Sequence, residues 1–143
     1  MRERRRERGA LLLPAVAALV LVCALAQAAS ASPNALRGRW AGRTSQRDRV
    51  QLRVVGHRVV ALRITADIRA ESCDVQISLA GTRLGVPISA ADTFRVKMAH
   101  GPSSAVVRGE FTSDRRARGT FAAAYRGSCG RGRAEGTWRA TRR

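Results

Sequence analysis

Histidine is scarce in this chain, and the patterns that mark common catalytic sites are missing. Only His57 and His100 occur, each beside a glycine in a predicted turn, and a metal site would need further ligands at recognisable spacing. The sequence also has no Gly-x-Ser-x-Gly elbow, no Cys-x-x-Cys pair and no glycine-rich loop leading into a helix. We therefore expect no enzyme activity, no catalytic residue, no metal and no cofactor.

Acidic residues are few: 10 Asp and Glu stand against 27 Lys and Arg, which gives a formal net charge of +17. The densest acidic group is Asp67, Glu71 and Asp74. Its spacing fits no calcium loop, and Arg63 and Arg69 are close enough in sequence to neutralise it. We interpret this group as a local charge pairing.

The basic surplus is almost entirely arginine, with Lys97 as the one lysine. Such a surplus favours anionic partners such as acidic wall polymers, nucleic acid or membrane surfaces. The arginines are spread along the whole chain, however, and arginine at indifferent surface positions is typical of a GC-rich genome, so a generic basic surface is the competing interpretation. The candidate polyanion-binding residues are Arg53, Arg63, Arg108, Arg115, Arg116 and Arg118.

Aromatic residues make up only 4% of the chain and do not alternate with basic residues in the manner of base-stacking proteins. Most follow a glycine by two positions, and residues two apart in a strand share a face. A ring of a neighbouring strand can then lie over the bare glycine and fill a narrow interior. The cassettes are Gly38-x-Trp40, Gly109-x-Phe111, Gly119-x-Phe121 and Gly136-x-Trp138, and we expect these four rings to be core aromatics.

One long hydrophobic run occurs, from Ala10 to about Ala26, and it follows a basic head. Small residues come next, with Ala-x-Ala sites that end at Ala28 and Ala31, so we interpret residues 1–31 as a cleaved secretory signal peptide. The alternative is an uncleaved membrane anchor, since the run is nearly long enough to span a bilayer.

After cleavage we expect a short linker over residues 32–36 and a single secreted β domain over residues 37–143, extracellular and with cell-envelope association as a further possibility. No membrane span remains in that part. Its two cysteines, Cys73 and Cys129, are most simply paired in a disulfide, because the chain is exported. In the chain-entropy model, closing so long a loop stabilises the fold by about 4 kcal/mol.

Apolar and polar residues alternate along most of this domain, and no helical period is sustained over ten residues. The pattern predicts an all-β fold of about eight strands in an antiparallel meander, either a small closed β-barrel or a two-sheet sandwich. The first and last strands both carry a tryptophan cassette, so closure would place them side by side. We expect inward residues at Val60 and Leu62 in the third strand, and a long connection over 81–93 with a short strand at 86–88.

These motifs together resemble a group of small secreted bacterial β domains of actinobacterial type, which are mostly uncharacterised. The shared features are Gly38-x-Trp40-x-Gly42, a mid-chain cysteine, the later Gly-x-aromatic cassettes and a cysteine followed by glycine. The resemblance implies export, a β fold and paired cysteines, but no active site. The Gly-x-Trp of the first strand is also similar to that of avidin and lipocalin barrels, which implies the option of a small-molecule cavity.

We therefore expect a secreted, non-enzymatic β domain that acts as a structural or protein-interaction module with an unknown partner. One alternative is a polyanion-binding protein that uses its arginine surface to hold an acidic wall polymer or nucleic acid. The other is a small-ligand carrier or a hydrolase that uses the mouth of the barrel.

Overall fold

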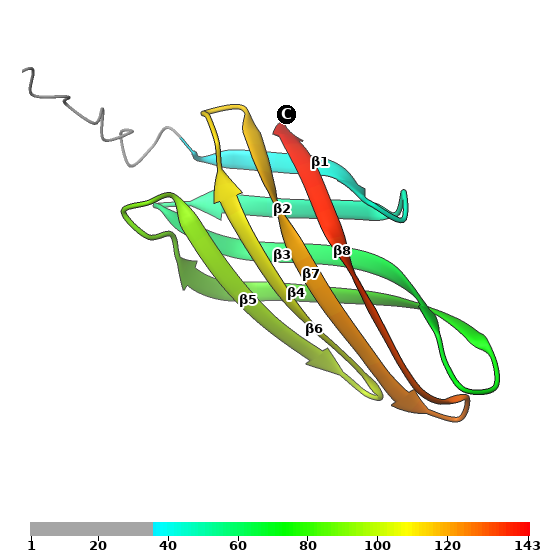
Figure 1. Ribbon diagram of the computed structural model, residues 1–143. Coiled ribbons are helices and arrows are strands. Elements are labelled where there is room, and N and C mark those ends of the chain that lie inside the picture. The colour runs from blue at the N-terminus through cyan, green and yellow to red at the C-terminus, as the bar shows by residue number, and fades with distance from the viewer. Residues whose placement is uncertain (1–35) are drawn as a thin grey trace, which may run out of the picture.

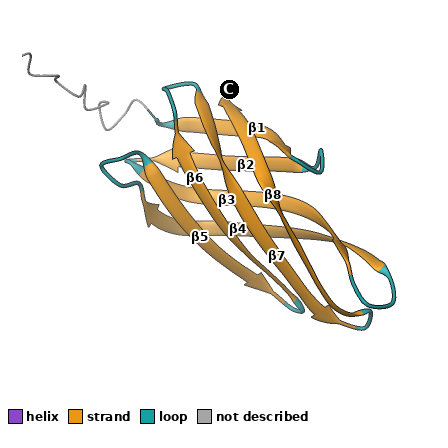
Figure 2. Ribbon diagram, viewed as in Figure 1, coloured by secondary structure: helices purple, strands orange, loops and turns teal. Residues whose placement is uncertain are grey.

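The computed structural model describes residues 36–143, and in this part of the chain every regular element is an antiparallel β-strand (Figure 2). The alternation of inward apolar and outward polar residues explains this, since each strand buries one face. No helix able to cross a bilayer occurs in residues 36–143. The strands are β1 (Gly38–Thr44), β2 (Arg49–Val55), β3 (Arg58–Arg69), β4 (Asp74–Pro87), β5 (Thr93–His100), β6 (Ser103–Phe111), β7 (Arg116–Gly127) and β8 (Gly130–Arg142).

The eight strands form one sheet in the order β4-β3-β2-β1-β8-β7-β6-β5, which curls into a nearly closed barrel (Figure 1). The predicted pairing of the first and last strands is confirmed: β1 and β8 run antiparallel, with Trp40 opposite Arg142 and Thr44 opposite Trp138. Strands consecutive in sequence pair everywhere except between β4 and β5. The open seam of the barrel therefore lies between these two strands and not between the chain ends.

The long connection predicted over 81–93 is wrong, because β4 continues to Pro87. Arg83 and Gly85 both have a φ of 62°, a left-handed conformation that takes up extra residues as a bulge. Pairing with β3 resumes at Val86, opposite Val59. The alternation is not regular enough at this point for a sequence pattern to reveal a strand.

The inward position predicted for Val60 is also wrong: Val59 is fully buried and Val60 is half-buried. The register of β3 shifts between Val59 and Ala61, where a bulge lets the strand slip by one residue. A slip of one residue exchanges the two faces of a strand, so Val59 turns inward while Leu62 keeps its expected place in the core.

All four predicted core aromatics are buried: Trp40 and Trp138 are 1% exposed, Phe121 2% and Phe111 5%. Trp40 packs edge-on against Phe111, with ring centroids 4.9 Å apart. Phe94 extends the cluster toward both Phe111 and Trp138. Rings thus fill the middle of the barrel, where a carrier would hold its ligand.

Two cassette glycines, Gly109 and Gly136, lie beneath rings as expected. Phe94, Gly109, Gly119 and Trp138 are neighbours in one row across β5 to β8. A Cβ on Gly109 would lie 2.5 Å from atoms of both Phe94 and Trp138, and Gly136 lies against Phe121 in the same way.

At the other two cassette glycines, Gly119 and Gly38, something other than a ring excludes a larger side chain. A Cβ on Gly119 would meet the carbonyl oxygen of Arg108 in the neighbouring strand, and one on Gly38 would meet the aliphatic part of Arg142. At Gly119 the added Cβ would first meet backbone, and at Gly38 an aliphatic stem, so at these two positions close approach of a neighbouring strand or side chain excludes a larger residue.

The predicted disulfide joins Cys73 in the β3–β4 turn to Cys129 in the two-residue β7–β8 turn. Ser72 also donates a backbone hydrogen bond to the Cys129 carbonyl, so the two hairpin tips are held together. Leu36 belongs to the core: it is 2% exposed, and its carbonyl accepts a hydrogen bond from Trp40 Nε1 at 3.1 Å. The predicted signal peptide, residues 1–31, lies outside the described residues.

Candidate functional site

The outer surface of the barrel carries a line of arginines that crosses four neighbouring strands. Arg49 on β2 is opposite Arg43 on β1, which is opposite Arg139 on β8. Arg139 is in turn opposite Arg118 on β7. All four are exposed. We call these four residues the arginine row.

The arginine row follows from alternation and closure. On each strand the arginine stands next to an inward residue of the core, as Arg139 does beside Trp138, so its side chain faces outward. The pairing of β1 with β8 then joins two segments distant in sequence into one continuous line. Cβ atoms of directly opposite residues are about 4.5–5.5 Å apart, so each pair places like charges side by side, which destabilises a sheet.

Little within the described residues neutralises this charge. Arg118 forms an ion pair with Glu110 on β6, and Arg43 donates a hydrogen bond to the carbonyl of Arg47. The other ion pairs found in residues 36–143 involve Arg69 and Arg142. Arg139 and Arg49 therefore have no carboxylate partner in this part of the chain.

A wide hollow of about 900 Å³ lies beside the row on the outer face of β5 to β8. Its floor is the backbone of Phe94, Gly109, Gly119 and Trp138, which are neighbours on β5 to β8 and whose side chains point inward. Its two walls are outward side chains of the residues on either side of this floor. We call this hollow the first groove; its walls include Arg95, Arg108, Arg118, Arg139, Thr120 and Thr137, and also Glu110, which pairs with Arg118.

A neighbouring hollow of about 610 Å³ runs parallel to the first groove across β7, β8 and β1. It shares Arg118 and Arg139 with the first groove, and its floor carries Gly42 and Ala140. These two arginines therefore form a ridge with a depression on each side. A bound chain in either depression would run across the strands and meet guanidinium groups along its length.

The six arginines predicted from the sequence divide into separate groups. Arg108 and Arg118 line the first groove, and Arg116 lines the neighbouring hollow. Arg53 and Arg63 lie together on the outer face of β2 and β3, in a different hollow.

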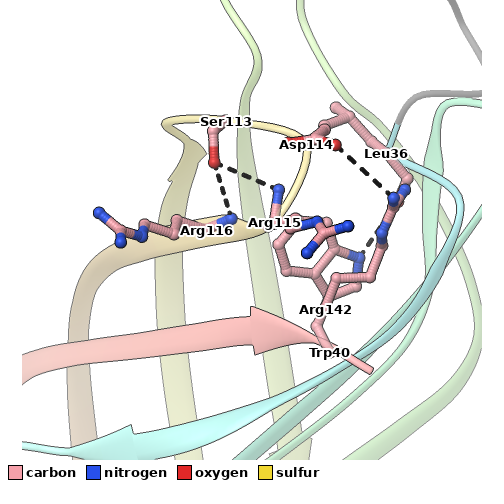
Figure 3. A network of polar contacts seen from close by, with 7 residues as sticks. All are labelled: Leu36, Trp40, Ser113, Asp114, Arg115, Arg116 and Arg142. Carbon is pink, nitrogen blue, oxygen red and sulfur yellow. Dashed lines mark hydrogen bonds and ion pairs between the residues drawn. The ribbon is translucent and has the colours of Figure 1, made fainter.

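Arg115 belongs to the β6–β7 turn, where its backbone has a structural role (Figure 3). Ser113 Oγ accepts hydrogen bonds from the backbone amides of Arg115 and Arg116. The Arg115 carbonyl accepts one from the amide of Arg142, whose side chain pairs with Asp114 at 3.8 Å. The turn thus holds the end of β8 in place.

Sequence reasoning missed Arg43, Arg49, Arg95 and Arg139. Their outward orientation could be read from their position next to core residues. The juxtaposition of Arg43 and Arg139 depends on the register of β1 against β8, for which the local pattern holds no signal.

Five of the acidic side chains lie outside the first groove, and Asp67, Asp74 and Glu135 line a hollow of their own. Arg69 Nε lies 3.4 Å from Asp74 Oδ1, and Gln76 donates a hydrogen bond to Asp67, so the predicted local charge pairing holds for this ion pair. Burial raises the pKa of Asp48, the negative charge of Asp67 adds to the rise, and Arg43 opposes it. The five are Asp48, Asp67, Glu71, Asp74 and Glu135.

The two histidines occupy the places expected of turn residues. His57 has a φ of 60° beside Gly56, and His100 ends β5 before Gly101. Among residues 36–143, no group of three or more His, Cys, Asp and Glu side chains is arranged to hold a metal ion. The chemistry available on this surface is therefore charge pairing and hydrogen bonding by guanidinium and hydroxyl groups.

Comparison with known proteins adds no relative: no protein family, no curated protein and no solved structure matches the chain.

Proposed function

We propose that this domain binds a linear anionic polymer that carries carboxylate or phosphate groups and has no aromatic bases. The observation that carries the proposal is the arginine row, in which four like charges stand directly opposite one another across β2, β1, β8 and β7. A sheet bears this cost at the expense of its stability. An anionic chain laid along the row would turn the repulsion into attraction.

The grooves support an extended ligand. The first groove crosses the strands, so Arg118 and Arg139 in one wall, and Arg95 and Arg108 in the other, stand at the spacing of neighbouring strands, about 4.7–4.9 Å. Threonines at 120 and 137 stand in the same wall as Arg108. Their hydroxyl groups can hydrogen-bond to the hydroxyls of a sugar or polyol backbone while guanidinium groups pair with its acidic groups.

The aromatic side chains argue against single-stranded nucleic acid. Proteins that bind it stack bases on exposed rings. Here both tryptophans and all three phenylalanines are buried, and Tyr125 is partly buried against the core. No ring is therefore presented in the first groove for a base to stack on.

The proposal is that of a non-enzymatic, exported binding domain. The disulfide is typical of proteins in oxidising compartments, and residues 1–31 have the composition of a secretory signal. A carbohydrate or polyol polymer of the cell envelope has the chemistry that this surface fits. We prefer this function to a general protein-interaction module because charge complementarity specifies the partner.

The test measures binding to polygalacturonate, a linear polyuronate, as a function of salt. Arg139→Glu is expected to lower the affinity at least tenfold at low salt, because it removes a central cation and adds a repelling anion. The dependence of log K on log salt should also become shallower, by about one unit for each lost contact.

The matched control is Arg131→Glu. It lies on the same strand, makes the same change in charge and also faces an arginine, Arg126, but it is remote from the row. It should lose far less affinity. Equal losses in the two variants would show that net charge alone drives binding, and tighter binding to single-stranded DNA than to polygalacturonate would overturn the choice of polymer.

A further inference from the structure

The hollow that contains Arg53 and Arg63 is a groove of its own, built on β1 to β4. Its floor lies over the inward row Trp40, Leu52 and Leu62, and its volume is about 510 Å³. We call it the second groove. Its walls carry four arginines, and small side chains between them leave it open: Arg39, Arg53, Arg63 and Arg143, with Ala41, Ala61 and Ala80.

The second groove, like the arginine row, carries positive charges that lie close together on the outer face. Arg39 is directly opposite Arg53, so two like charges again stand side by side on paired strands. No Asp or Glu lines this groove. Within residues 36–143, neither Arg53 nor Arg63 has an ion-pair partner. This surface is therefore complementary to an anionic chain and, unlike the first groove with Glu110, carries no acidic side chain.

The two grooves lie on opposite outer faces. Strands β5 to β8 cover one side of the core and β1 to β4 the other, and the two halves cross in Figure 1. Residues of β3 contact β7 and β8 across the interior, and β4 contacts β6, so these halves face each other through the core. One straight polymer segment cannot reach both grooves, whereas two segments can.

We infer that the domain binds two segments of anionic polymer at once and so cross-links polymer chains. This inference rests on the proposed function and adds to it a second binding site and a bridging role. A domain with one groove would coat a polymer, whereas a domain with two opposed grooves joins neighbouring polymer strands into a network.

The experiment uses two forms of the same probe. Isothermal titration with a short oligogalacturonate counts the sites, and light scattering with long polygalacturonate reports cross-linking. The unmodified protein is expected to bind two oligomers per domain and to raise scattering strongly. Arg139→Glu should remove the site on β5 to β8 and Arg53→Glu the site on β1 to β4, so each variant should bind one oligomer and fail to cross-link.

Arg131→Glu serves as the control for net charge and should keep both sites and the scattering. One oligomer bound per unmodified domain, or scattering that survives in Arg53→Glu, would overturn the inference but leave the proposed function standing. A long polymer that binds one domain at both grooves, by wrapping around the β1–β8 side without cross-linking, would also overturn it. Absence of any binding would instead overturn the proposed function.

Discussion

Arg43 and Arg139 face each other across the junction of β1 and β8, where the first and last strands of the domain pair. Both are exposed, and within residues 36–143 neither forms an ion pair, although the charge of Arg43 acts on the Asp48 carboxyl. Two positive charges thus sit at the β1–β8 junction, on which closure of the barrel depends. The requirements of folding and of binding oppose each other at this point.

Arg139→Thr should therefore make the domain more stable. The substitution relieves repulsion from both Arg43 and Arg118, each pair being worth about 0.2–1 kcal/mol, and threonine suits a strand. Urea denaturation at low and high salt would measure the effect. The gain should shrink as salt screens the charges, and a variant less stable than the unmodified protein at low salt would contradict this account.

Gly109→Ala should destabilise the domain by about 1–3 kcal/mol, the usual cost of overpacking a core. The added Cβ would lie 2.5 Å from Phe94 Cζ and from Trp138 Cζ2. Combining it with Phe94→Leu should cost less than the sum of the two single changes, because the smaller side chain frees space. Thermal or chemical denaturation of the two single variants and the double variant would measure the coupling. Additive losses would show that the ring does not lie over the glycine.

Deleting residues 134–143 should abolish folding and not merely shorten a tail. The segment contains most of β8, which pairs with both β1 and β7, and it removes Trp138 from the core. Circular dichroism during heating should then show no cooperative transition. A truncated protein with an unchanged thermal midpoint would contradict the role of closure.

Replacing both cysteines, Cys73→Ser with Cys129→Ser, should destabilise the domain by about 4 kcal/mol in the chain-entropy model. The bond closes a loop between residues 56 apart in sequence. Denaturant titrations with and without a reductant would measure this loss. Reductant should weaken the unmodified protein and leave the double variant unaffected, and equal sensitivity of the two would argue against the bond.

Asp48→Asn should stabilise the domain at neutral pH and flatten its dependence on pH. Burial raises the pKa of Asp48 above its model-compound value of 3.8, so the folded state holds this proton more tightly than the unfolded state. The contribution of Asp48 to stability is therefore greatest in acid and falls as the pH rises from 3.8 through the raised pKa. Denaturant titrations from acidic to neutral pH would measure both slopes, and identical slopes would contradict the prediction.

Much of the fold could be predicted from the sequence because its signals are local. Alternation located the strands, and the tryptophan cassettes at both ends indicated closure. The extension of β4 could not be predicted, since left-handed Arg83 and Gly85 break the alternation without ending the strand. The slip at Val59 escaped prediction for the same reason, because a bulge changes the inward face in mid-strand.

The candidate site was only partly predictable. Arg108 and Arg118 could be identified as outward basic residues, but nothing local distinguishes them from Arg115, which holds a turn. The arginine row depends on the register between β1 and β8. A register shifted by two residues would keep every side chain on its face and yet place Thr141 or Thr137 opposite Arg43 in place of Arg139.

The placement of the seam also dictates the order in which this sheet can assemble. Strands β1 to β4 and β5 to β8 are two runs of hairpins, and each can form from contacts close in sequence. Docking of β8 onto β1 must then bring together segments from the two ends of the domain and bears the entropy of closing that long loop. We expect this docking to limit the folding rate and, because it must overcome the repulsion of Arg43 and Arg139, to be accelerated by added salt.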